Sequence, residues 1–354
     1  MQIIELLTPA YEAAWLPWAV QYFFLAGIAT GAALLVAACG LALARPASAP
    51  DAPLSPLARL TPVAVLTLAV VAIAAPVSLL ADLHQPARFW HFYAHFTPWS
   101  WMSLGALLLP AFVALALAMC ASWWLGRLRW MRLLAPLLVL SALSIVLYTG
   151  AEVMVVRARP LWHTAWLPVN LALTGWLAAI GVMLLIERFL PAALRPHDAA
   201  LQLLRRIALA LGALLALATL SWFTLGLVAR SPSLLAALRL WNDFPVWRAG
   251  MVLSALGGVA VLAVLLAGRT RMACPWYRAM LGLLLAGSAW AFRWALFMSV
   301  QGVPKFGAGL YLYTMPLGSD GLLGMLGVFG LCIALVAAAT WALETWPALK
   351  PARA

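Results

Sequence analysis

The side chains that could move protons concentrate in one stretch, 80–102, which lies between two long apolar runs. Asp82 closes the first run, and His84 and His91 are two of the three histidines that follow it. Carboxylate and imidazole groups are the usual acids and bases of proton transfer. Arg88 lies six residues after Asp82 and could pair with it, which would keep the carboxylate ionised. The stretch is therefore a candidate site of proton chemistry.

The same stretch carries several amphipathic aromatic side chains, at Trp90, Tyr93, Trp99 and Trp101. Such rings settle where a membrane meets water, because one edge is apolar and the other can form a hydrogen bond. An interfacial connector with no chemistry of its own would have the same composition. The rest of the chain has to decide between these two interpretations.

Two further pairs of polar residues lie in apolar runs. Tyr148 and Glu152 are four residues apart, so they share one face of a helix. An acid in a membrane span costs about 2.5–3.5 kcal/mol on insertion scales, and it is retained for pairing, for snorkelling or for proton transfer. Gln21 and Tyr22 lie near the start of the first apolar run, where a binding pocket or an aromatic belt could use them.

The composition identifies the class of protein. Hydrophobic residues make up 66% of the chain and charged residues 9%, and the mean hydropathy is +1.01, values that a soluble domain cannot have. The net charge of +12 comes from basic residues in short segments between apolar runs, so nucleic acid is not an expected partner. The four cysteines form no C-x-x-C pair, and no metal site is expected.

The hydrophobic pattern predicts an all-α integral membrane protein with nine transmembrane helices, because only helices satisfy their backbone alone in lipid. The loops after the odd-numbered helices hold fourteen Lys and Arg residues and the alternate loops seven, with Arg293 in mid-span. Positive residues favour the cytoplasm, so we expect the N-terminus outside and the C-terminus in the cytoplasm. The predicted helices are 17–43, 60–81, 101–125, 134–156, 164–189, 206–229, 246–268, 276–299 and 320–345.

The redox chemistry open to such a chain is limited. Haem would need histidines deep in facing helices, and the histidines here lie in loops or at helix ends, so neither haem nor an iron–sulfur cluster is expected in this chain. A lipid-soluble quinol needs only an apolar slot, hydrogen-bonding partners for two ring oxygens, and a group that accepts protons. Tyr22, Asp82, Tyr148, Glu152 and the four histidines of the outer segments are suitable groups, and all lie toward one membrane face.

Four separated motifs now carry a resemblance: WLPWAVQYFFLAGIATG, ADLHQPARFWHFYAHFTPWSWM, YTGAEV followed by RARPLW, and VPKFGAGLYLYTMPLGSDGLLGMLG. Together they resemble the quinol-oxidising membrane anchors of the polysulfide-reductase and nitrite-reductase (NrfD-like) type, and within that family the tetrathionate-reductase branch. The resemblance covers nearly the whole chain in order.

The resemblance implies a single multi-pass domain over 1–354 in the inner (cytoplasmic) membrane of a bacterium. Helices one to four, 17–156, would form one bundle with the quinol site. Helices five to eight, 164–299, would form a second, with 320–345 as an additional ninth helix. It also implies partners: a periplasmic four-cluster iron–sulfur subunit and, through it, a molybdopterin catalytic subunit that reduces tetrathionate. This chain would oxidise menaquinol or ubiquinol.

The family's quinone contacts correspond to Ala19, Tyr22 and Tyr148 here, and only the tyrosine at 148 is unchanged. Gln21 could replace a lost hydrogen-bonding group. The residues expected in proton transfer are Asp82, His84, Tyr148 and Glu152, and those expected to contact the quinone are Gln21, Tyr22, Tyr148, Asp82, Arg88 and His91.

Other functions remain open. An anchor of a related polysulfide or thiosulfate reductase would share these motifs. A transporter would line a path with Arg293, Glu152 and Asp82 and should gather its polar groups near the membrane midplane. A purely structural anchor would have no site. For the leading hypothesis, Arg157 and Arg159 are expected to dock the iron–sulfur partner.

Overall fold

The computed structural model describes residues 15–44, 54–83, 85–303 and 313–348. Within these residues the chain is helical, without a strand. Nine of the helices described are long and apolar enough to cross a membrane. These findings confirm the all-α class and the nine expected spans, while the orientation of the termini stays a prediction.

The spans follow the apolar runs of the sequence, each near or above the length that crosses about 30 Å of hydrocarbon. They are α1 (Pro17–Leu43), α2 (Thr61–Asp82), α4 (Trp101–Trp124), α5 (Leu128–Met154), α6 (Trp166–Ile186), α7 (Asp198–Val228), α9 (Pro245–Ala267), α10 (Pro275–Trp294) and α11 (Leu322–Thr345). A π-helical turn, Ala295–Ser299, continues α10.

Two predicted starts are wrong. We expected helices from 134 and 206, but α5 begins at Leu128 and α7 at Asp198. Arg129 and Arg132 in α5, and Asp198, Arg205 and Arg206 in α7, lower the hydropathy, so the apolar pattern begins later than the helix does. A helix that extends past the hydrocarbon tolerates such charges because they reach water.

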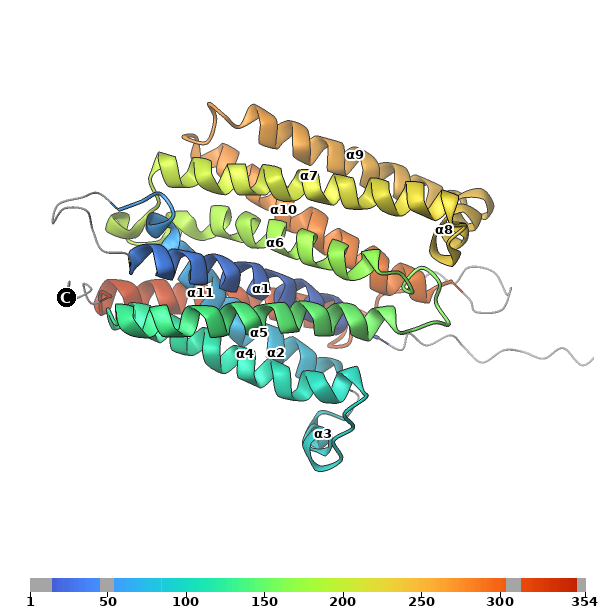
Figure 1. Ribbon diagram of the computed structural model, residues 1–354, viewed down its shortest axis with the longest axis horizontal. Helices are drawn as coiled ribbons and strands as arrows, with labels where there is room; N and C mark the ends of the chain where they lie inside the picture. The colour runs from blue at the N-terminus through green and yellow to red at the C-terminus, as the bar shows by residue number, and fades with distance from the viewer. Residues whose placement is uncertain (1–14, 45–53, 84, 304–312, 349–354) are drawn as a thin grey trace, which may run out of the picture.

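Two short helices were not predicted. Helix α3 (His91–Ala94) lies between α2 and α4, and α8 (Pro232–Asp243) lies between α7 and α9. Both are too short to span a membrane. Figure 1 shows them at the same end of the molecule as the connector between α5 and α6. We call this end the outer end, after the predicted orientation.

Helix α1 lies in the middle of the molecule (Figure 1) and packs against α2 and α5 on one side and α6 and α10 on the other. Two glycines allow the close approach of α1 to α6, because a Cβ on Gly27 would lie 3.0 Å from the Cα of Gly175. The small residues of the first predicted helix therefore serve packing. Helices α7 and α9 are peripheral, and most of their surface faces outward.

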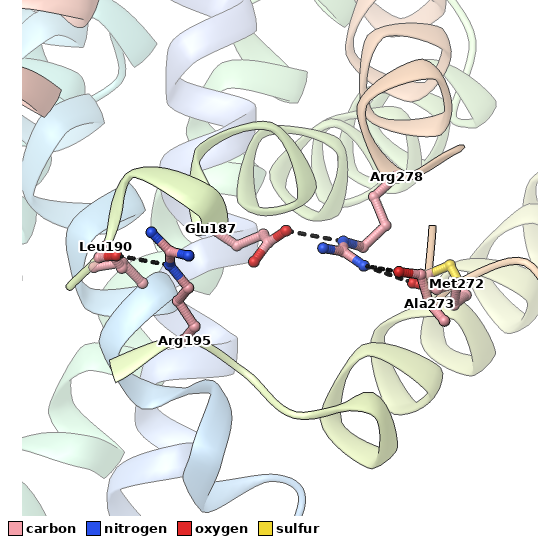
Figure 2. A network of polar contacts seen from close by, with 6 residues as sticks. All are labelled: Glu187, Leu190, Arg195, Met272, Ala273 and Arg278. Atoms are coloured by element: carbon pink, nitrogen blue, oxygen red, sulfur yellow. Dashed lines mark hydrogen bonds and ion pairs between the residues drawn. The ribbon is translucent and has the colours of Figure 1, made fainter. Parts of the chain in front are cut away.

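At the opposite end an ion pair joins α6 to α10. Glu187 follows α6 and accepts a 2.8 Å bond from Nε of Arg278, which also donates to the carbonyls of Met272 and Ala273. Figure 2 shows Arg195 on the other side of Glu187, where it donates to the Leu190 carbonyl at 3.0 Å. The pair fixes the start of α10 and thereby the helix that carries Arg293.

Candidate functional site

Tyr148 is the centre of a polar cluster at the outer end. It lies on α5, is 4% exposed, and its ring covers Gly105 of α4. A Cβ at position 105 would lie 2.5 Å from the Tyr148 hydroxyl oxygen and still closer to the ring carbons. Gly105 therefore leaves the space that the ring occupies, because any larger residue would displace it.

Tyr22 reaches the same cluster from α1. It is 1% exposed and interacts with the side chain of Tyr148. Its hydroxyl oxygen is buried and has no hydrogen bond of regular geometry among the residues described. A buried hydroxyl without a partner costs free energy, about 1–3 kcal/mol by mutational data. Such a group is retained more easily if a ligand supplies the partner.

Glu152 lies one turn after Tyr148 on α5 and also interacts with it. The residue is partly exposed, but its Oε2 atom is buried and unpaired within the described chain. Asp82, at the end of α2, is close enough to interact electrostatically with Glu152. The carboxylate of Asp82 also accepts a 3.2 Å bond from the backbone N–H of Leu16, so it holds the start of α1.

Gln21 is the most buried of the predicted ligands. The side chain is fully buried, and both its Oε1 and its Nε2 atoms lack a hydrogen-bond partner in the part of the chain that is described. A buried side-chain amide whose donors and acceptor form no hydrogen bond is unusual in a protein interior. Gln21 is therefore a candidate for a hydrogen bond that the described residues do not supply.

A group of apolar side chains begins one turn inward from the two tyrosines, and the gap between them is too small for a water molecule. Ala26 follows Tyr22 by one turn, Ile145 precedes Tyr148 by three residues, and Leu109 follows Gly105 by four. Apolar side chains of α1, α2 and α4 complete the lining: Ala29, Val71, Ala72, Ala75, Pro76, Phe112 and Val113. Apolar walls with a few polar groups at one end have the composition of sites for lipid-soluble ligands, but in this structure the walls are in close contact and enclose no open pocket.

The structure brings four predicted residues together, namely Tyr22, Asp82, Tyr148 and Glu152. His84 lies outside the described residues. Arg88 and His91 lie on the segment between α2 and α4.

There Arg88 donates to Gln85 at 2.8 Å, and the ring of His91 lies 4.0 Å from that of Trp90. Gly105 was missed, because a glycine in an apolar run gives no signal of what it contacts.

Arg293 has a different environment. It is 1% exposed and donates to the carbonyls of Phe23, Leu171 and Ala289 at 2.9–3.0 Å and to Thr174 Oγ1 at 3.1 Å. A cavity of about 10 Å³ beside it has room for about one water molecule. Arg293 thus links its own helix, α10, to α1 and α6.

Arg157 and Arg159 differ as well. Arg157 is exposed. Arg159 donates to the carbonyl of Val300 at 2.8 Å and lies over the ring of Trp162, which in turn donates to the Leu296 carbonyl at 2.8 Å. Arg159 and Trp162 therefore hold the end of α10 in place.

Comparison with known proteins adds two findings. The family model described as "Polysulphide reductase, NrfD" matches residues 6–301. The chain is also 36% identical over 350 residues to a subunit of the tetrathionate reductase of Salmonella typhimurium (strain LT2), and the match covers 94% of this chain and 93% of that protein.

Proposed function

Because the chain belongs to the polysulphide reductase NrfD family, and is a membrane protein similar to a subunit of a reductase complex, we propose that it oxidises membrane quinol. It would anchor the complex and deliver the electrons to an iron–sulfur partner. One observation carries the proposal: Tyr22 and Glu152, whose buried oxygens lack a hydrogen bond of regular geometry among the described residues, interact with Tyr148 one turn outward from a group of apolar side chains. That arrangement has the composition that a quinol ring and its apolar tail need.

The residues have separate roles. The phenol of Tyr148 can accept a hydrogen bond from a quinol hydroxyl or donate one to a quinone carbonyl without ionising. The side chains of Tyr22 and Gln21 offer further partners for the ring oxygens. These side chains would orient the quinol ring, and the ring oxygens would in turn be their hydrogen-bond partners.

The carboxylates take the protons. Oxidation of one quinol releases two protons and two electrons. Glu152 would accept a proton at its buried Oε2 atom and pass it to water through its exposed part, with Asp82 close by as a second acceptor. The two electrons would leave singly, each to an iron–sulfur cluster of the partner.

The proposed complex is a tetrathionate reductase in the inner membrane of a bacterium. The molybdopterin subunit, which reduces tetrathionate, would receive its electrons through a four-cluster iron–sulfur subunit. We propose that the iron–sulfur subunit docks at the outer end near Arg157, whose side chain is exposed. Either menaquinol or ubiquinol is compatible with apolar walls.

The test measures reduction of the partner's clusters in the intact complex, driven either by quinol or by an artificial soluble donor that reduces the partner directly. Tyr148→Phe, Glu152→Gln and Asp82→Asn should each slow the quinol-driven rate and leave the donor-driven rate unchanged. Asp243→Asn is the matched control, because Asp243 is an exposed acid at the end of α8.

If Tyr148→Phe and Glu152→Gln both retain the quinol-driven rate within about twofold, which corresponds to only about 0.4 kcal/mol of barrier, the site lies elsewhere. If the donor-driven rate falls equally, the variants have disturbed the assembly and not the oxidation of quinol.

A further inference from the structure

The segment between α2 and α4, residues 86–100, exposes an unusual number of large aromatic side chains. We call it the outer connector. Trp99 is 85% exposed and Trp90 52%, and three more aromatic residues are largely exposed: Phe89, Tyr93 and Phe96. Soluble surfaces rarely present so large an apolar patch, so some partner must cover it.

A hydrogen bond attaches the outer connector to the side of α4. The hydroxyl of Tyr93 donates to the carbonyl of Ala106 at 3.0 Å. Ala106 lies five residues beyond Trp101, the first residue of α4, which is about 7.5 Å along a helix that rises 1.5 Å per residue. The ring of Tyr93 therefore lies below the outer end of α4 and not above it.

The surroundings of this bond are apolar and exposed. Met102 and Leu107, on α4, are largely exposed apolar residues. Figure 1 shows α3 beside the outer ends of α2 and α4, at the edge of the molecule opposite α7 and α9. The connector thus lies at the rim, at the depth where amphipathic segments enter the boundary of headgroups and acyl chains, about 5–10 Å.

The charge of the segment fits the same surroundings. No Asp or Glu occurs between Asp82 and Glu152, while the connector holds Arg88, His91 and His95. Phosphate groups of phospholipids carry the complementary charge. Tryptophan and tyrosine are the residues that proteins concentrate at the level of the headgroups.

We propose that the outer connector is a membrane anchor that lies among the phospholipid headgroups of the outer leaflet, with Trp90, Tyr93 and Trp99 as its anchoring side chains. Its partner is the lipid and not another subunit. A protein partner above the bundle would not reach an aromatic ring that lies below the end of α4. The inference holds whether or not the chain oxidises quinol.

The experiment places the photoreactive amino acid p-benzoylphenylalanine at position 99, in the assembled complex in native membranes. Trp99 is almost fully exposed, so this change removes little packing. Two matched positions calibrate it: Trp276, 81% exposed at the opposite end of the molecule, and Arg157, exposed on the connector between α5 and α6.

We expect illumination to join position 99 to phospholipid, seen as a lipid mass on the peptide that contains it, as at position 276. A cross-link from position 99 to another protein would overturn the proposal. So would the absence of any product at 99 while 276 captures lipid, because the side chain would then lie in water. If position 157 captures no protein, the result counts against the proposed docking of the iron–sulfur subunit and leaves the proposal of a membrane anchor unaffected.

As a second measurement, a fluorophore on Trp99→Cys should be quenched more strongly by lipids that carry a spin label near the headgroup than by lipids labelled near the end of the acyl chain. Equal, weak quenching by both would contradict the anchor.

Discussion

Gly105→Ala should abolish most quinol oxidation by displacing a single ring. The added Cβ would lie 2.5 Å from the Tyr148 hydroxyl oxygen, whereas ordinary contacts lie at about 3.5 Å. The ring must therefore move by about 1 Å or more. A misplacement of about 1 Å can cost about a hundredfold in rate, which corresponds to about 2.7 kcal/mol.

The assay is again cluster reduction by quinol, compared with reduction by the soluble donor. We expect the quinol-driven rate to fall about a hundredfold while the donor-driven rate is kept. Gly257→Ala is the control, because no atom lies within 4 Å of a Cβ at that position. The melting temperature of each variant is recorded as well, since overpacking also costs about 1–3 kcal/mol of stability.

A double-mutant cycle then tests whether Gly105→Ala lowers the quinol-driven rate by displacing Tyr148. In a Tyr148→Ala background the added methyl group has no ring to displace, so Gly105→Ala should cause little further loss. The reasoning is refuted if Gly105→Ala retains the full quinol-driven rate, or if its effect is undiminished in that background.

The other predictions concern the framework and the topology. Arg293→Lys should lower the melting temperature more than Arg293→Met. Lysine keeps a buried charge but cannot reach acceptors on three helices, whereas methionine removes the charge. The reverse order would show that the charge itself is needed. Glu187→Gln should destabilise the protein by about 1–3 kcal/mol, since it weakens the bond to Arg278, and an unchanged thermal transition would contradict this. Arg159→Ala should also lower the melting temperature, whereas Arg157→Ala should leave it unchanged and release the soluble partners from membranes; retention of the partners would count against docking there. An alkaline phosphatase fused to the C-terminus should be inactive, and a strongly active fusion would overturn the predicted orientation.

The hydropathy of the chain predicts the nine spans well, because a run of about twenty apolar residues has the length and composition of a membrane-spanning helix. It predicts the starts of α5 and α7 poorly, because charged residues near the start of a helix interrupt the apolar run without ending the helix. The short helices α3 and α8 were missed because neither has the length that the pattern reports.

The candidate site was predictable where spacing along one helix decides proximity. Tyr148 and Glu152 share a face of α5 by their separation alone. The position of Tyr22 beside them depends on how α1 packs against α5, which no local pattern contains. The same limit applies to Arg157 and Arg159 after α5. The two look alike in the sequence, but Arg159 holds the end of α10 and Arg157 is exposed.

The central position of α1 has a consequence for biosynthesis. The first helix to be made receives its bond from Arg293 only 270 residues later, and Gln301 exchanges two 3.0 Å bonds with the backbone of Trp15 across 286 residues. At about 5–20 residues per second, the ribosome needs on the order of tens of seconds to supply these neighbours. A nascent chain that stops before α10 can therefore pack α1 against α2, α5 and α6 but lacks the bonds from Arg293 and Gln301.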